Sequence, residues 1–286
     1  MLIATVSAKG APGVSVASLA WTLQWPRPVL LAECEPRGSD FQVGYAHDRA
    51  GGGRDLLAVH MNSKRGAAMD AAVREQVLQL GLEESRWLLL GVPEPQQAAA
   101  IDWPRLARAL ATLDGVDVIA DCGAIWSVSA PRQVWAAADL VVLVLRATAA
   151  GVRSAQLAIP RLRADLTELG MGADRLAAVV IGPGRPYSLA EVKAALRPPS
   201  VVGEPEVPVV PVIETLPWDE SAAEFLSTGV PRRRGFAGSK LAAQAVKSAS
   251  ALIDEAERLK TEATATRSSA PSPAFAGVHD LLRGTR

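Results

Sequence analysis

Short apolar runs, separated by longer amphipathic stretches, recur through most of this sequence. Four of the runs predict buried strands, at residues 2–6, 28–32, 86–90 and 116–120. The longer stretches predict helices, because their apolar positions follow a helical period. Helices are expected at residues 15–23, 55–80, 104–113, 152–169, 188–196, 220–227 and 239–260. Pro160 lies inside one of them, where a kink or break is expected.

The alternation of strands with helices predicts an α/β fold. Strand–helix–strand units joined by right-handed crossovers build a doubly wound, mostly parallel sheet with helices on both faces. Ligands of such sheets bind at the carboxyl ends of the strands. Residues 9–15, 33–40 and 121–126 each follow a predicted strand, so we expect them on one rim of the sheet.

The most informative local feature is the turn that follows the first strand, Lys9-Gly10-Ala11-Pro12-Gly13-Val14-Ser15. A strand, a glycine-rich turn and a helix start form a phosphate cradle, because backbone N–H groups and the helix dipole attract an anion. In the G-x-x-x-x-G-K-[ST] loop a lysine precedes the hydroxyl residue. Here Val14 stands in that place, and its isopropyl group cannot pair with phosphate.

This turn resembles the deviant Walker A loop of ParA/MinD-type P-loop ATPases, K-G-G-x-G-K-[ST]. Lys9 stands at the signature lysine, Gly10 and Gly13 keep the glycines, and Ser15 keeps the magnesium-binding hydroxyl, whereas Val14 and Ala11 depart. The resemblance implies a nucleotide-binding segment made of Lys9, Gly10, Ala11, Pro12, Gly13, Val14, Ser15 and Val16.

Acidic residues resemble the family's switch regions. Glu33-Cys34-Glu35 occupies the place of two aspartates in the first switch, and Asp121-Cys122-Gly123 looks like the Walker B aspartate and second switch. The resemblance implies that Glu35 and Asp121 are catalytic, and that Ser15, Glu33 and Asp121 hold magnesium.

The resemblance covers roughly residues 1 to 260. Residues 139–146, 176–181 and 212–217 look like the later strands, and Pro217-Trp218-Asp219 is similar to the turn before the family's penultimate helix. We therefore expect one P-loop domain over residues 1–260, followed by a disordered tail over residues 261–286, which is rich in Thr, Ala, Ser and Pro.

Three departures from the family pattern predict a degraded nucleotide site. Val14 removes a cation; Glu33 and Glu35 extend their carboxylates by one methylene; and Ile181-Gly182-Pro183-Gly184 replaces the family's asparagine. Loss of one charge-assisted hydrogen bond, about 1.5–3 kcal/mol, weakens binding by about one to two decades. Binding of ATP and magnesium is therefore expected to be weakened, unless Lys9 or Arg37 supplies the lost charge.

The resulting hypothesis is a pseudo-ATPase. It would act as a dimerising adaptor or regulator that positions cellular machinery, such as the septum, the chromosome or a pilus or secretion system, with a component of that machinery as its protein partner. Two alternatives stay open: an active, slow, partner-stimulated ATPase, and a scaffold without ligand. The homodimer is expected to form through the rim that contains Lys9, Glu33, Glu35 and Trp126, with Trp126 filling the emptied site or making the dimer contact.

Composition limits the choice of partners. The 30 Lys and Arg residues balance 30 Asp and Glu residues, so bulk charge predicts no polyanion partner. Arg232, Arg233 and Arg234 could contact DNA non-specifically, but only weakly. The pattern near helical spacing in residues 275–282 favours a short motif for a protein partner over a membrane anchor.

The length of the apolar runs and the use of cysteine both bear on the cellular compartment. No apolar run reaches the ~18 to 20 residues that a transmembrane helix needs, and no signal peptide is recognisable, so a soluble cytoplasmic protein is expected. Cys34 and Cys122 are expected to be buried free thiols. The three histidines lack the spacing of a zinc site.

Overall fold

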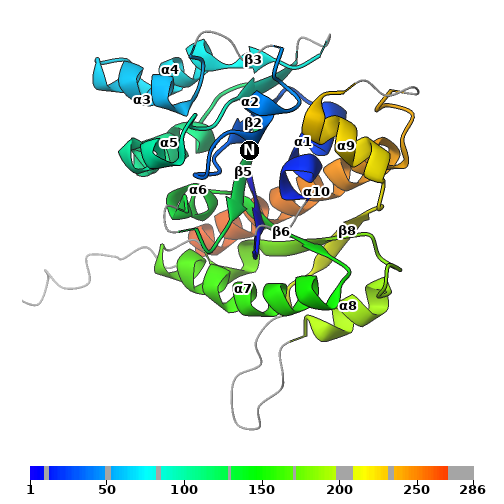
Figure 1. Cartoon of the computed structure of the whole chain (residues 1–286). Helices are drawn as coiled ribbons and strands as arrows, with labels where there is room; N and C mark the ends of the chain where they lie inside the picture. Colours follow the sequence, from blue (N-terminus) through cyan, green and yellow to red (C-terminus); the bar gives the residue numbers. More distant parts are fainter. Residues whose placement is uncertain are drawn as a thin grey trace, which may run out of the picture.

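The computed structural model describes residues 1–9, 13–48, 53–81, 85–127, 130–169, 172–197, 209–230 and 235–269. These residues form an eight-stranded sheet between two layers of helices (Figure 1). The strands are β1 (Leu2–Ser7), β2 (Val29–Glu33), β3 (Leu78–Gln79), β4 (Arg86–Leu89), β5 (Asp117–Ala124), β6 (Leu140–Arg146), β7 (Leu176–Ile181) and β8 (Val212–Leu216).

The strands lie in the order β3-β4-β2-β5-β1-β6-β7-β8. Every neighbouring pair is parallel except β3 and β4, which are antiparallel. The predicted fold class, a doubly wound and mostly parallel sheet, is confirmed. Because β1 lies between β5 and β6, the turn that follows it leaves from the middle of the sheet.

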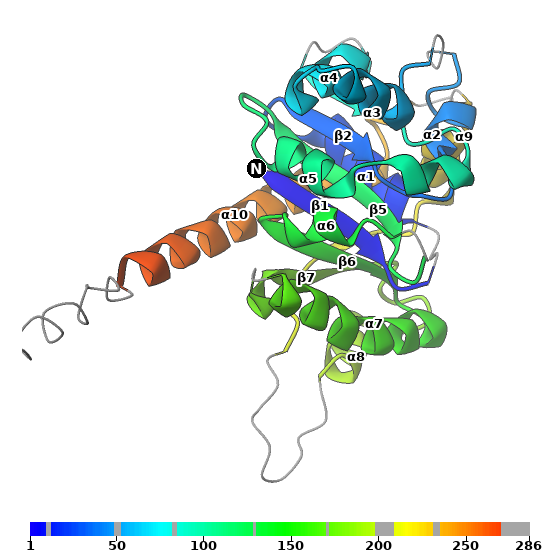
Figure 2. The ribbon, with the colours of Figure 1, turned by 90° about the vertical axis from the view of Figure 1, so that its left-hand side faces the viewer.

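Helices cover both faces of the sheet (Figure 2). One face packs against α1 (Val14–Gln24), α2 (Asp40–Val43), α9 (Glu220–Thr228) and α10 (Lys240–Ser269). The other packs against α3 (Leu56–Lys64), α4 (Met69–Gln76), α5 (Trp103–Ala111), α6 (Arg132–Ala136), α7 (Ala149–Glu168) and α8 (Leu189–Ala195). Two short 3₁₀ helices, η1 (Pro95–Ala100) and η2 (Ala173–Arg175), complete the described elements.

Local sequence explains where many of these helices start. Thr148 and Asp219 cap α7 and α9, because their side-chain oxygens accept from the backbone N–H groups of Gly151 and Ala222. Ser188 opens a capping box at α8. The caps lie where the period of apolar positions begins, so element order and most boundaries follow from the sequence.

The structure corrects several boundaries. The segment 55–80 is not one helix: α3 and α4 are separated by a turn at Gly66, whose φ of 105° favours glycine, and β3 follows. Helix α7 runs from Ala149 to Glu168 without a break at Pro160. Helix α10 continues past the predicted end at Lys260 to Ser269. The short helices α2 and α6 were not predicted, because neither is long enough to show a period.

Some predictions concern residues outside the described ranges. They include Gly10, Ala11 and Pro12 of the turn, most of the connector 198–211, the arginines 232–234 and residues 270–286. Within the described part of the chain, no helix is both long and apolar enough to cross a membrane.

Candidate functional site

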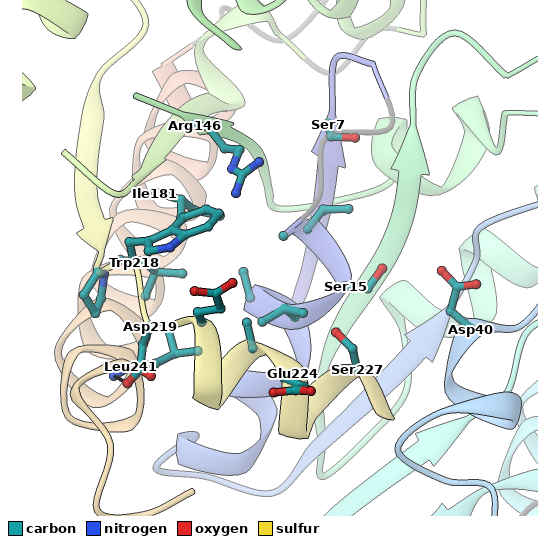
Figure 3. A pocket seen from close by; sticks show the side chains of 18 of the residues that line it. Ser7, Ser15, Asp40, Arg146, Ile181, Trp218, Asp219, Glu224, Ser227 and Leu241 are labelled. Atoms are coloured by element: carbon teal, nitrogen blue, oxygen red, sulfur yellow. Dashed lines mark hydrogen bonds between the residues drawn. The ribbon is translucent and has the colours of Figure 1, made fainter. Parts of the chain in front are cut away.

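The carboxyl ends of the strands border a cavity of about 610 Å³ (Figure 3). Five parts of the chain line it: the end of β1, the start of α1, the segment after β2, the ends of β6 to β8, and α9 with the start of α10. The lining residues are Ser7, Gly13, Val14, Ser15, Val16, Ala17, Glu35, Arg37, Asp40, Arg146, Ile181, Leu216, Pro217, Trp218, Asp219, Glu220, Ala223, Glu224, Ser227 and Leu241. The cavity therefore lies at the rim where the sequence predicted a ligand site.

Helix α1 presents its N-terminus to this cavity. Gly13 precedes it with a φ of 128°, and a Cβ there would lie 2.7 Å from Ile181 Cδ1, so this position requires glycine. No side chain caps the helix. Backbone N–H groups of the first turn are therefore free of a side-chain acceptor, which is the arrangement that binds an anion.

Val14 is the first residue of α1 and is only 6 % exposed. Its side chain belongs to the apolar core on the α1 face of the sheet. The position where a phosphate-binding loop carries lysine is thus filled by a packed apolar group. The turn therefore keeps the backbone N–H groups of a phosphate cradle, but position 14 supplies no side-chain cation.

Ser15 lines the cavity, and Asp121 lies near it, fully buried and outside the lining. The Gly123 backbone N–H donates to Asp121 Oδ1 at 3.1 Å, and the nearby Ser15 hydroxyl favours the charged form of the Asp121 carboxylate. Asp121 Oδ2 is buried and has no hydrogen-bond partner among the described residues. Burial raises the pKa of Asp121 to about 6, although the Ser15 hydroxyl and the Gly123 N–H lower it.

This pair fits a magnesium ion. Magnesium prefers oxygen ligands and keeps several of its waters, and an unpartnered carboxylate oxygen beside a hydroxyl provides acceptors for them. Ser15 and Asp121 would hold the ion, which would supply positive charge to phosphate oxygens. The chain's own contribution is to hold the Ser15 hydroxyl near the Asp121 carboxylate.

Glu35 also lies at the cavity, but its carboxylate is already engaged. Arg37 donates from Nε to Oε1 and from Nη2 to Oε2, both at 2.9 Å, and the Ala124 N–H donates to Oε2 at 3.2 Å. Glu35 packs so closely on Gly123 that a Cβ there would lie 1.5 Å from Oε2. The ion pair neutralises Arg37, so this guanidinium is a poor source of the charge that Val14 lacks.

Glu33 is buried at the end of β2. Its carboxylate accepts from the Ser39 hydroxyl, from the Phe41 N–H at 3.2 Å and from the Gly91 N–H at 2.8 Å. Glu33 does not line the cavity; it ties the first turn of α2 to the end of β4. Burial raises its pKa to about 7. The structure therefore brings Ser15 and Asp121 together, as predicted for a magnesium site, but commits Glu33 to the scaffold.

Of the remaining predicted residues, some line the cavity and others do not. Val16 lines the cavity, whereas Lys9 is exposed and does not. Trp126 is 53 % exposed and also lies outside the lining, so it does not fill the site. Sequence reasoning missed Arg146, although it ends a predicted strand at the ligand-binding rim. Glu220 and Glu224 were also missed, because residues of α9 reach the cavity only through tertiary packing.

The lining carries more carboxylates than guanidiniums. The carboxylates are Glu35, Asp40, Asp219, Glu220 and Glu224, and the guanidiniums are Arg37 and Arg146. Asp219 is partly engaged, since its oxygens accept from the N–H groups that start α9 and α10. An excess of negative charge opposes the binding of a polyphosphate unless a cation accompanies it.

No protein-family model matches the sequence, and no curated protein matches it significantly. Solved structures do match the fold. A ParA family ATPase from Chlorobium tepidum TLS superimposes with a TM-score of 0.62 at 17% identity, covering 87% of this chain and 98% of that one.

Two further solved structures are similar to this chain in fold. The septum site-determining protein MinD from Pyrococcus horikoshii, complexed with Mg-ADP, has a TM-score of 0.62 at 17% identity and covers 87% of this chain and 93% of its own. The MinC:MinD cell division complex of Aquifex aeolicus has a TM-score of 0.60 at 16% identity, with 91% and 96% covered. The chain has the ParA/MinD-like P-loop fold.

Proposed function

We propose that this chain is a ParA/MinD-like P-loop protein with a degraded nucleotide site. It acts as a dimerising adaptor or regulator that positions cellular machinery, such as the septum, the chromosome or a pilus or secretion system. The observation that carries the proposal is Val14, a core-packed side chain at the place of the loop lysine. The similar structures include a Mg-ADP complex and a MinC:MinD complex, which supports looking for both a nucleotide and a protein partner.

Charge in the cavity supports the degraded site. A nucleoside triphosphate brings about three to four negative charges, and its binding needs compensating donors. Arg37 is neutralised by Glu35, and Glu220 and Glu224 add negative charge on the α9 side. Binding of ATP should therefore be weak and should depend strongly on magnesium.

A second candidate function is a slow, partner-stimulated ATPase. The observation in its favour is the Ser15–Asp121 pair with its unpartnered, buried Asp121 Oδ2, which suits a magnesium-bound nucleotide. Hydrolysis by this route would need the Glu35 carboxylate, which is now bound to Arg37. A partner that released Arg37 from Glu35 would free that group.

The deciding experiment is a calorimetric titration of the purified protein with ATP, with and without magnesium, followed by an assay for phosphate release. The degraded site predicts a Kd well above about 1 μM and no turnover without a partner. A Kd below that value, or steady hydrolysis by the protein alone, would favour the ATPase. No binding at millimolar ATP would remove nucleotide from the proposal and leave the adaptor.

A further inference from the structure

Arg146 differs from the other cations near the cavity. Arg37 is held by two hydrogen bonds to Glu35, and Lys9 lies outside the lining. Arg146 lines the cavity, and no carboxylate among the described residues pairs with it. Its guanidinium is therefore a cation that is free to meet an anionic ligand.

The sheet register places Arg146 beside the phosphate-type turn. Arg146 ends β6, the strand next to β1, and its register partner on β7 is Ile181. The tip of Ile181 lies against Gly13, immediately before α1. Val142 and Val144 point into the core on the α1 face, and alternation along the strand sends Arg146 to that same face. Figure 3 shows its guanidinium directed into the cavity.

Trp218 holds this guanidinium without neutralising it. The Arg146 guanidinium carbon lies 3.9 Å from the centroid of the Trp218 ring. A cation–π contact orients the planar group but leaves its N–H donors available. Gly182 lies against the ring, because a Cβ there would lie 3.7 Å from Trp218 Cε3. Trp218 is thus a positioning residue for Arg146.

We propose that Arg146 is the phosphate-binding cation of this cavity and takes over the charge that Val14 cannot supply. Its ligand is the polyphosphate of a nucleoside diphosphate or triphosphate, bound between the N-terminus of α1 and the end of β6. The planar fork of arginine suits two phosphate oxygens at once. The inference rests on the proposed nucleotide site, but it concerns which residue binds and holds for either candidate function.

The test is calorimetric titration with Mg-ADP, Mg-ATP and inorganic pyrophosphate on the full chain. Arg146→Ala should weaken binding of all three by about 10- to 100-fold, the value of one charge-assisted hydrogen bond. Arg146→Lys should keep part of the affinity. The matched control is Arg153→Ala, which removes the same charge from an exposed position on α7. Thermal unfolding of each variant checks that the fold is intact.

Two further measurements separate binding from structure. If Arg146 replaces the loop lysine, Val14→Lys should restore the affinity that Arg146→Ala removes. Ligand binding should also change the tryptophan fluorescence, because phosphate comes to the guanidinium that lies on the Trp218 ring, and Trp218→Phe should abolish that change. Equal affinities for Arg146→Ala and wild type, or no binding of any probe to wild type, would overturn the inference and leave the adaptor proposal standing. A Kd for ATP below about 1 μM would instead contradict the degraded site.

Discussion

Glu33 and Asp121 are register partners on β2 and β5, yet their carboxylates have different surroundings. Both oxygens of Glu33 accept hydrogen bonds from the scaffold, whereas Asp121 keeps one buried oxygen without a partner. An unsatisfied buried oxygen costs free energy that a structural role does not explain. At the scale of single residues, Asp121 is therefore the carboxylate suited to a ligand, and Glu33 belongs to the framework.

The raised pKa of Glu33 predicts a pH-dependent contribution to stability. A carboxyl with a folded pKa of about 7 binds its proton more tightly when folded than when unfolded. Its stabilising contribution is complete below the unfolded pKa of about 4.5 and is lost as the pH rises through about 7. Glu33→Gln should remove this dependence, so the stability of the variant relative to wild type should increase from pH 5 to pH 8, by up to about 1.4 kcal/mol per pKa unit.

Urea unfolding at each pH measures this difference. Asp254→Asn, at an exposed position of α10, is the control and should track wild type. Parallel stability curves for Glu33→Gln and wild type would show that the Glu33 carboxyl titrates normally.

A second prediction at this scale concerns Val14. If the backbone at the start of α1 still forms a phosphate cradle, Val14→Lys should tighten Mg-ATP binding by about 10- to 100-fold. The same substitution at Val43, which is 80 % exposed and outside the cavity lining, is the control and should leave affinity unchanged. An unchanged affinity in folded Val14→Lys would mean that the turn itself, and not only the side chain, no longer suits phosphate.

Among the elements, α10 lines the cavity at its first turn and packs against the core as far as Leu259. It packs on α1 and β8, and Trp21 Nε1 donates to Ser248 Oγ at 2.8 Å across the α1–α10 contact. The buried stripe of α10 comprises Leu241, Ala242, Ala245, Ala249, Leu252, Ile253, Ala256 and Leu259. The described side chains beyond Leu259 are exposed or half-buried, so the stabilising part of the helix ends near Lys260.

Removal of residues 261–286 should therefore leave the Tm nearly unchanged. The deletion breaks the Arg258–Glu262 ion pair, which is exposed and worth about 1 kcal/mol or less. Leu252→Ala, inside the buried stripe, should instead cost about 2–5 kcal/mol. Calorimetric melting of both proteins tests the contrast. A fall of several degrees on truncation would mean that the C-terminal segment packs on the domain.

For the whole molecule, the rim that surrounds the cavity is the proposed dimer surface. Ser7 at the end of β1 is in register with Ala124 of β5, so Lys9 and Trp126 leave the sheet from neighbouring strands. Both are exposed, whereas Glu33 and Glu35 are buried and cannot form the contact that the sequence suggested. The proposed interface is therefore narrower than the predicted rim.

We expect a homodimer without added ATP, because burial of apolar groups such as Trp126 contributes about 25 cal/mol per Å². Lys9→Ala and Trp126→Ala should weaken it, while Val246→Ala, at an exposed apolar position on α10, should not. Light scattering over a concentration series measures the dissociation. A wild-type protein that stays monomeric at tens of micromolar, with or without ATP, would contradict this interface.

The sequence by itself determined most of the longer elements and the place of the phosphate-type turn. Residues 2–6 were predicted as a strand and lie within β1, and Val14 could be recognised in place of the lysine, because apolar runs and motif spacing depend on neighbours along the chain. Only the tertiary structure decided what these elements bring together. Arg146 and Trp218 meet because β6, β7 and β8 are adjacent, and Glu33 turns to Gly91 because β2 lies beside β4. Such contacts depend on strand order and packing, which no local pattern encodes.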